Sequence, residues 1–181
     1  MSNAKYYAKL TIVLLVITMV VAGLLGYVNS ITENRIAEIK AEKTAAAMKA
    51  VMPEAETFNT IDYNGENSLV SAAYKAEGSS GAIGYVFEVV PVGFGGDINM
   101  VVGVDTAGKV TGVSIVSMSE TSGLGDNAKK PSFLNQYVGK SGTLAVTKDG
   151  GSIDALTGAT VTSRAVTNGV NAALDAAKEL G

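Results

Sequence analysis

Thr157-Gly158-Ala159-Thr160 lies between Asp154 and a helical pattern that runs from residue 162 to residue 180. These four residues are small or hydroxylated, and none is an acid, a base or a metal ligand. The N-terminus of a helix carries unpaired amides and a partial positive charge, which favour a bound phosphate. No Lys or Arg occurs between Lys148 and Arg164, so backbone amides and hydroxyls would hold any anion there. The residues alone leave two interpretations open: a ligand site, or an ordinary helix cap formed by a hydroxyl at position 162 or 163.

Alternation of β-branched residues precedes this turn and predicts a β-sheet. The expected strands are residues 69–75, 83–92, 98–105, 109–118 and 143–147, with Gly, Asp and Ser clusters between them. A short helix is expected at residues 132–138. The closing helix, residues 162–180, has small apolar residues on one face that would pack closely on a sheet. These patterns predict an α+β fold, an antiparallel sheet with flanking helices.

The composition excludes several kinds of chemistry. The chain of 181 residues has no Cys and no His, which removes thiol nucleophiles, histidine bases and the usual ligands of zinc, iron–sulfur clusters and haem. We therefore expect no catalytic residue and no metal ligand, and any redox chemistry would need an organic cofactor. A net charge of −3 argues against nucleic acid as the main partner.

Residues 10–28 are uncharged and rich in Leu, Ile, Val, Ala and Met. As a helix rising about 1.5 Å per residue, they would span roughly the 30 Å hydrocarbon core of a bilayer. Tyr6, Tyr7 and Tyr27 flank the segment, as interfacial aromatic residues do. The alternatives are a buried core helix and a cleavable signal peptide, but the apolar run is longer than that of a signal peptide. We therefore expect a retained single-pass transmembrane helix in contact with membrane lipid.

The charges beside this segment do not decide its orientation, because basic residues both precede and follow it. Residues 33–52 continue with apolar residues at helical spacing, and Pro53 ends the pattern before an irregular acidic stretch. We interpret residues 1–9 as a tail, residues 29–67 as a solvated helical connector and residues 68–181 as the folded domain.

A second motif follows the strand expected at residues 109–118. Residues 119–125, S-E-T-S-G-L-G, group a carboxylate, three hydroxyls and two glycines at a strand end, where ligand-binding loops commonly lie. From the residues alone, this motif is either a ligand loop or a solvated turn. The Gly-rich residues 93–97 are interpreted as a turn between two strands and nothing more.

Both motifs resemble those of a known family. D-A-L-T-G-A-T at residues 154–160 is similar to the flavinylation signature D-x-x-(S/T)-G-A-T of FMN-binding domains, found in the G subunit of the Rnf complex and the C subunit of the sodium-translocating NADH:quinone oxidoreductase. Residues 120–125 look like the family's E-T-P-G-L-G, with Ser122 in place of Pro, and V-M-P at residues 51–53 resembles its V-L-P after the anchor. The two motifs stand in the family's order behind one anchor, and the length of the chain favours the Rnf protein.

The resemblance implies a covalent flavin. In the family, the last Thr of the signature carries FMN through a phosphoester, which corresponds to Thr160 here. A magnesium-dependent flavin transferase makes this bond with FAD as donor, and Asp154 belongs to the sequence that it recognises. The rest of the attachment turn is Thr157, Gly158 and Ala159. The residues expected to line the isoalloxazine ring are Glu120, Thr121, Gly123 and Leu124.

The resemblance also implies a function. The protein would be a membrane-anchored electron-transfer subunit, a relay rather than a self-sufficient enzyme, in an Rnf-type ferredoxin:NAD⁺ oxidoreductase complex that moves Na⁺ or H⁺. Its partners would be the other membrane subunits and the flavin transferase. It would lie in the cytoplasmic (inner) membrane, with residues 1–9 in the cytoplasm and the FMN domain on the extracytoplasmic side. Two alternatives remain: a stand-alone anchored FMN-domain protein for extracellular electron transfer, and a non-redox anchored structural domain.

Overall fold

The computed structural model describes residues 2–65, 67–79 and 81–181 and divides the chain into two compact units between Glu42 and Lys43. The first unit is the N-terminal part of helix α1 (Ser2–Val51). Within the described residues, α1 is the one helix long and apolar enough to cross a membrane, with a mean hydropathy of 2.5 in its most apolar window. The residues expected to cross a membrane, 10–28, are therefore helical and form part of a longer helix.

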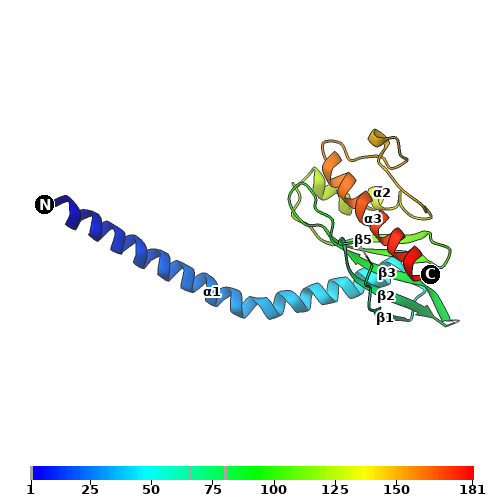
Figure 1. Ribbon diagram of the computed structural model, residues 1–181, viewed down its shortest axis with the longest axis horizontal. Coiled ribbons are helices and arrows are strands. Elements are labelled where there is room, and N and C mark those ends of the chain that lie inside the picture. The colour runs from blue at the N-terminus through cyan, green and yellow to red at the C-terminus, as the bar shows by residue number, and fades with distance from the viewer. Residues whose placement is uncertain (1, 66, 80) are drawn as a thin grey trace. The chain divides into compact units, whose positions relative to one another are not determined.

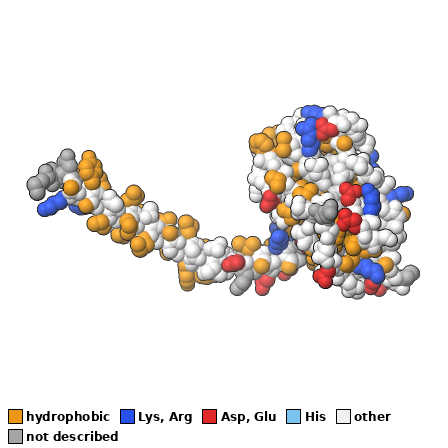
Figure 2. Space-filling view, viewed as in Figure 1, with side chains coloured by type: hydrophobic (Ala, Val, Ile, Leu, Met, Phe, Trp, Pro, Cys, Tyr) orange, Lys and Arg blue, Asp and Glu red, His pale blue; other side chains and the backbone are white. Residues whose placement is uncertain are grey.

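The surface of this first unit is unusual for a helix that meets water. Apolar side chains are exposed along it (Figure 2), from Leu10 to Ile31. Its threonine hydroxyls donate hydrogen bonds back to helix carbonyls, as Thr11 does to Tyr7 O at 2.9 Å and Thr32 to Val28 O at 2.9 Å. A polar side chain satisfied within its own helix can face hydrocarbon without losing a hydrogen bond.

The second unit is built on one antiparallel sheet (Figure 1). Its strands are β1 (Thr57–Ile61), β2 (Val70–Gly78), β3 (Gly81–Val89), β4 (Asn99–Asp105) and β5 (Val110–Ser117). They lie in the order β1-β2-β3-β4-β5, so each strand pairs with its neighbour in the chain. This is the antiparallel sheet that the alternating patterns predict.

Helices cover both faces of the sheet. Helix α3 (Thr160–Leu180) packs across β2, β3 and β4 (Figure 1) and buries the larger core, which includes Phe87 and Leu174. The last turns of α1 belong to this second unit and cover the other face, where Val51 packs against Val86 and Val101. The result is a three-layer α+β domain, as expected from a sheet with two apolar faces.

The structure differs from the expectation in three segments. Residues 57–61 form strand β1, paired in register from Thr57–Glu77 to Ile61–Ala73, so the stretch after Pro53 is not irregular throughout. Residues 143–147 form no strand but only an isolated bridge from Val146 to Ile153, followed by the 3-10 helix η2 (Thr147–Asp149). The helix expected at residues 132–138 is the shorter α2 (Pro131–Leu134), preceded by the 3-10 helix η1 (Gly125–Lys129).

Two amide side chains, one in α3 and one in the turn after α2, hold the irregular residues that lead to α3. The amide of Asn171 donates to Leu144 O and its oxygen accepts from Leu144 N, both at 2.8 Å. Gln136 clamps the backbone of Asp154 in the same manner, accepting from its N–H at 2.7 Å and donating to its carbonyl at 3.3 Å. These clamps replace the hydrogen bonds that a strand would have supplied, and they fix the path of the chain into the turn at residues 157–160.

Candidate functional site

Helix α3 begins at Thr160, two residues earlier than the helical pattern predicts. Its N-cap is Ala159, which has no side-chain capping bond, so of the two interpretations left open by the sequence, a helix cap at residue 162 or 163 is not formed. The hydroxyl of Ser163 is instead turned back into the turn, where it accepts from Leu156 N at 3.0 Å and donates to Ala159 O at 2.9 Å. The first amides of any α-helix lack intrahelical acceptors, and in α3 the N-cap residue makes no side-chain hydrogen bond to them.

Gly158 is required by the shape of this turn. Its φ of +75° lies in the left-handed region, which costs other residues roughly 1–2 kcal/mol. A Cβ atom there would also lie 3.0 Å from Cδ2 of Leu124. The turn at residues 157–160 and the loop at residues 119–125 therefore touch at this glycine, and the fold joins the two motifs that are separate in the sequence.

A lysine lies beside Thr160. Nζ of Lys148 donates a hydrogen bond to Oγ1 of Thr160 at 3.0 Å. The expectation that only backbone amides and hydroxyls would meet an anion is therefore wrong, because the fold returns the segment before the turn to the start of α3. No local signal in the sequence reveals this contact, since the two residues are joined only by the path of η2 and the loop after it.

Glu120 ties three segments together. Its Oε1 accepts hydrogen bonds from the amides of Phe94, at 2.8 Å, and Gly95, at 3.1 Å. Its Oε2 accepts from the hydroxyl of Thr162 on α3, at 2.9 Å. Both carboxylate oxygens are thus engaged, and the side chain connects the Gly-rich turn, the loop and the helix.

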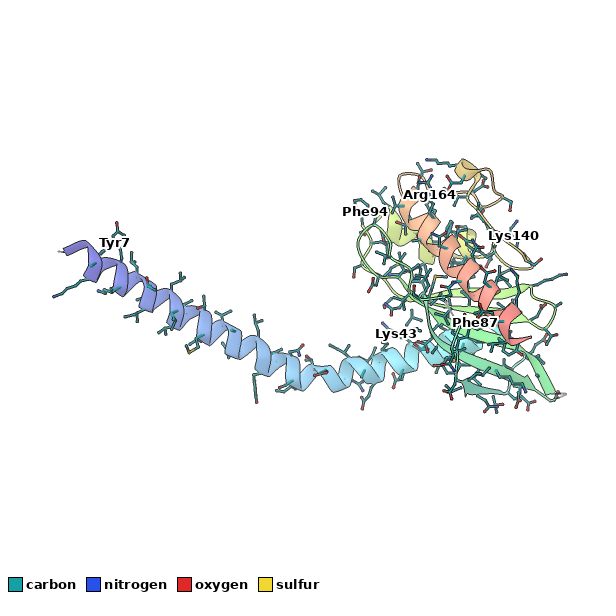
Figure 3. The ribbon with its side chains drawn as sticks, in the orientation of Figure 1. Tyr7, Lys43, Phe87, Phe94, Lys140 and Arg164 are labelled. Carbon is teal, nitrogen blue, oxygen red and sulfur yellow. The ribbon has the colours of Figure 1, made fainter. Side chains whose placement is uncertain are left out.

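The Gly-rich turn at residues 93–97 is part of this site, although the sequence interpretation treats it only as a connection between strands. A Cβ at Gly93 would collide with Oε1 of Glu120, and one at Gly95 with the carbonyl of Ser119. The glycines thus allow close approach to the loop, while Phe94 between them is 74% exposed. Figure 3 shows Phe94 at the same end of the domain as Arg164 on α3. In the sequence, the signal that could have indicated this part of the site is an aromatic residue flanked by glycines, Gly93-Phe94-Gly95.

These elements enclose a pocket of about 390 Å³, a size within the range of small-molecule sites. Its lining residues are Phe94, Glu120, Thr121, Leu124, Gly125, Lys148, Gly158, Ala159, Thr160, Val161 and Thr162. The start of α3 and the Lys148 ammonium present positive charge, which suits an anion. Phe94 and Leu124 present exposed apolar surface, which suits a flat ring.

The predicted site residues divide into two groups. Those on the pocket wall are Glu120, Thr121, Leu124, Gly158, Ala159 and Thr160. Asp154, Thr157 and Gly123 do not line it, and Asp154 and Gly123 are exposed. Gly123 shapes the loop instead, with a φ of +79° and a carbonyl that accepts from Nδ2 of Asn127 at 2.7 Å.

A pocket with positive charge at one end and apolar side chains at the other suits a phosphorylated ring compound. The family model described as FMN-binding domain matches residues 93–175, from the Gly-rich turn into α3. The match covers every residue of the pocket wall. The crystal structure of the C subunit of the Na⁺-translocating NADH-quinone reductase from Parabacteroides distasonis has a similar fold, with a TM-score of 0.54 and 22% identity over 67% of this chain and 75% of that one.

Relatives that align with nearly the whole chain identify the family more closely. The G subunit of the ion-translocating oxidoreductase complex of Methanosarcina acetivorans is 33% identical, over 97% of this chain and 96% of its own. The G subunit of the Na⁺-translocating ferredoxin:NAD⁺ oxidoreductase complex of Acetobacterium woodii is 30% identical, over 97% of this chain and 94% of its own. The G subunit of the proton-translocating ferredoxin:NAD⁺ oxidoreductase complex of Clostridium ljungdahlii is 37% identical, over 89% of this chain and 86% of its own. The chain belongs to the family of the G subunits of ion-translocating oxidoreductase complexes.

Proposed function

We propose that this protein is a membrane-anchored electron-transfer subunit that carries FMN bonded through a phosphoester to the hydroxyl of Thr160. One observation carries the proposal. That hydroxyl belongs to the first residue of α3, on the wall of the pocket, 3.0 Å from the Lys148 ammonium. A phosphate attached there would lie at the positive end of the helix, where anions are stabilised.

The pocket residues suit the two ends of FMN. The first amides of α3 and Lys148 would hold the phosphate, and Phe94 and Leu124 would contact the isoalloxazine ring. Thr121, also on the pocket wall, would offer its hydroxyl to the polar edge of the ring. FMN supplies the redox chemistry when bound; the residues of the chain position it and limit the access of water.

Asp154 and Thr157 would have a different role. Both lie outside the pocket wall, and Asp154 is exposed. The side chain of Gln136 makes two hydrogen bonds to the backbone of Asp154, so the exposed side chain of Asp154 projects from a held segment of backbone. This arrangement suits recognition by the flavin transferase better than contact with the flavin.

The family supports a role inside a complex. Relatives are named as subunits of ferredoxin:NAD⁺ oxidoreductase complexes that translocate sodium ions or protons. We infer that this chain relays electrons between other membrane subunits of such a complex, and that it does not itself bind ferredoxin or NAD. Purification through this protein should therefore recover other membrane subunits, whereas recovery of a lone protein would favour the stand-alone alternative.

The carrier assignment is tested by replacing the hydroxyl. The full chain, produced with a flavin transferase, should give a fluorescent flavin band on a denaturing gel, because a phosphoester survives unfolding. Thr160→Ala should lose the band completely. Thr143→Ala is the matched control, since this exposed threonine lies outside both motifs and outside the pocket wall, and it should retain the band. A flavin band that survives Thr160→Ala would contradict the proposal.

The topology can be tested with single cysteines, because the chain has none of its own. We propose that residues 10–28 cross the membrane and that the FMN domain lies on the extracytoplasmic side. A cysteine at the exposed Ser122 should react with a membrane-impermeant thiol reagent in intact cells, and one at Lys5 should react only after the cells are opened. The reverse pattern would place the domain in the cytoplasm.

A further inference from the structure

We propose that Lys148 selects Thr160 as the hydroxyl to be modified and then pairs with the phosphodiester formed there. The proposal rests on the covalent FMN proposed above and goes beyond it, since it assigns a positioning and charge-stabilising role to a residue outside both motifs. The supporting observations are the surroundings of the neighbouring hydroxyls and the manner in which η2 is fixed to α3.

The four hydroxyls between residues 157 and 163 have different surroundings. Thr162 is 1% exposed and donates to Glu120, and Ser163 is 0% exposed and donates to the carbonyl of Ala159. Their protons are engaged and their oxygens are out of reach of a second protein. Thr157 lies outside the pocket wall. Within the described residues, Thr160 is the one of these four that lines the pocket and accepts a hydrogen bond from a cation.

An ion pair next to Lys148 joins its segment to α3. Asp149, the following residue in η2, accepts two hydrogen bonds from Arg164, from Nε at 2.7 Å and from a terminal nitrogen at 2.6 Å. The hydrogen bonds from Arg164 lower the pKa of the Asp149 carboxyl from its usual value, which favours the ionised form of this side chain. Arg164 lies four residues after Thr160, about one helical turn. The bidentate geometry therefore holds η2 beside the first turn of α3 and presents Lys148 to Thr160.

The chemistry of the transfer places a charge at this contact. Thr160 Oγ1 would attack the FMN-side phosphorus of FAD, so that an Oγ1–P bond forms, the P–O bond to AMP breaks and AMP leaves, while the hydroxyl proton passes to water. A neutral hydroxyl is thereby replaced by a phosphodiester with one negative charge. Lys148 donates to this oxygen, so it is not the base that removes the proton; it stabilises the charge that develops.

The test measures the rate at which the purified full chain, in detergent, incorporates flavin from FAD with the transferase. Lys148→Ala should slow incorporation about tenfold, the factor expected for loss of one charge-assisted hydrogen bond. Lys148→Arg should restore most of the rate because it keeps a cation. Lys178→Ala is the matched control: this exposed lysine pairs with Asp175 in the last turns of α3, and its loss should leave the rate unchanged.

Salt and peptide mapping separate a charge effect from a merely structural one. The difference in rate between the native chain and Lys148→Ala should shrink at high ionic strength, because exposed charges are screened. Peptide masses should locate the flavin on Thr160 in the native chain, with a larger share on Thr157 in Lys148→Ala. The role of Lys148 would be overturned if Lys148→Ala incorporated flavin at the native rate and on Thr160, or if Lys148→Arg slowed incorporation as much as Lys148→Ala. Either result would leave the assignment of Thr160 as the carrier intact. Flavin on Thr160→Ala would overturn the proposed function itself.

Discussion

At the scale of single residues, Glu120 has a role that its motif does not reveal. The resemblance implies that it lines the flavin ring, and it does lie on the pocket wall. Yet its carboxylate already accepts from the amides of Phe94 and Gly95 and from the hydroxyl of Thr162. We therefore interpret Glu120 as the residue that holds Phe94 and the start of α3 in place, so that its effect on a flavin is exerted through its neighbours.

This role predicts a difference between two substitutions. Glu120→Ala removes the acceptor of three donors and should lower the free energy of unfolding by about 1–3 kcal/mol. Glu120→Gln should cost less, about 1 kcal/mol or below, because its amide oxygen can accept from the two backbone amides and its NH₂ can donate to Thr162. Chemical denaturation measures both values.

The control for this pair is Glu77→Ala. That side chain lies near the surface, where it pairs with Lys75 at 3.2 Å and accepts from Asn59. An exposed ion pair contributes roughly 0–1 kcal/mol. If Glu120→Ala unfolds no more easily than Glu77→Ala, the three hydrogen bonds of Glu120 do not hold the site together.

At the scale of elements, the helices and strands that could be predicted are those whose apolar residues recur at a regular spacing in the sequence. The runs of β-branched residues in the regions of β2 to β5 and the helical spacing in α3 reveal these elements from the sequence, because their side chains follow the regular period of a strand or a helix. Strand β1 could not be found this way, since its residues lie at the edge of the sheet and none of them is fully buried. Residues 143–156 could not be predicted either, because distant side chains, those of Gln136 and Asn171, supply their hydrogen bonds.

The same division holds for the site. The motif resemblance indicates Thr160 and Leu124, and both lie on the pocket wall. It does not indicate Lys148 and Phe94, although both line the same pocket. Lys148 comes from η2, and Phe94 from a turn 26 residues before the glutamate that accepts its amide hydrogen bond. Such contacts depend on how the chain is folded over the whole domain, and a local sequence pattern does not reveal that.

Two glycines explain how the end of α1 joins the sheet. Gly103 and Gly112 face each other across β4 and β5. A Cβ at Gly112 would lie 2.9 Å from Cα of Val51, and one at Gly103 would lie 3.0 Å from Val51 O. The hydroxyl of Thr111 also donates to Val51 O at 2.7 Å. The end of α1 therefore packs on a part of the sheet that has no side chains, at Gly103 and Gly112. This packing gives a structural reason for the V-M-P segment at the end of α1.

At the scale of the whole molecule, the compact unit begins inside a continuous helix. The sequence interpretation places the start of the domain at residue 68, after a connector. In the structure the second unit starts at Lys43, within α1, because Ala47, Met48 and Val51 are buried against the sheet. One helix thus contains both the apolar segment suited to a membrane and a layer of the flavin domain.

This arrangement predicts where the chain can be shortened. A fragment of residues 43–181 should be soluble, unfold cooperatively and incorporate flavin at Thr160, because it keeps the complete second unit. A fragment of residues 53–181 loses Met48, Val51 and Met52, all of which are at most 7% exposed. Each contributes roughly 1.5–3 kcal/mol through burial, so their loss approaches the whole stability of about 5–15 kcal/mol of a typical domain. Thermal unfolding followed by circular dichroism should give a much lower midpoint, and flavin incorporation should fall with it. Equal midpoints for the two fragments would mean that the end of α1 is not part of the folded domain.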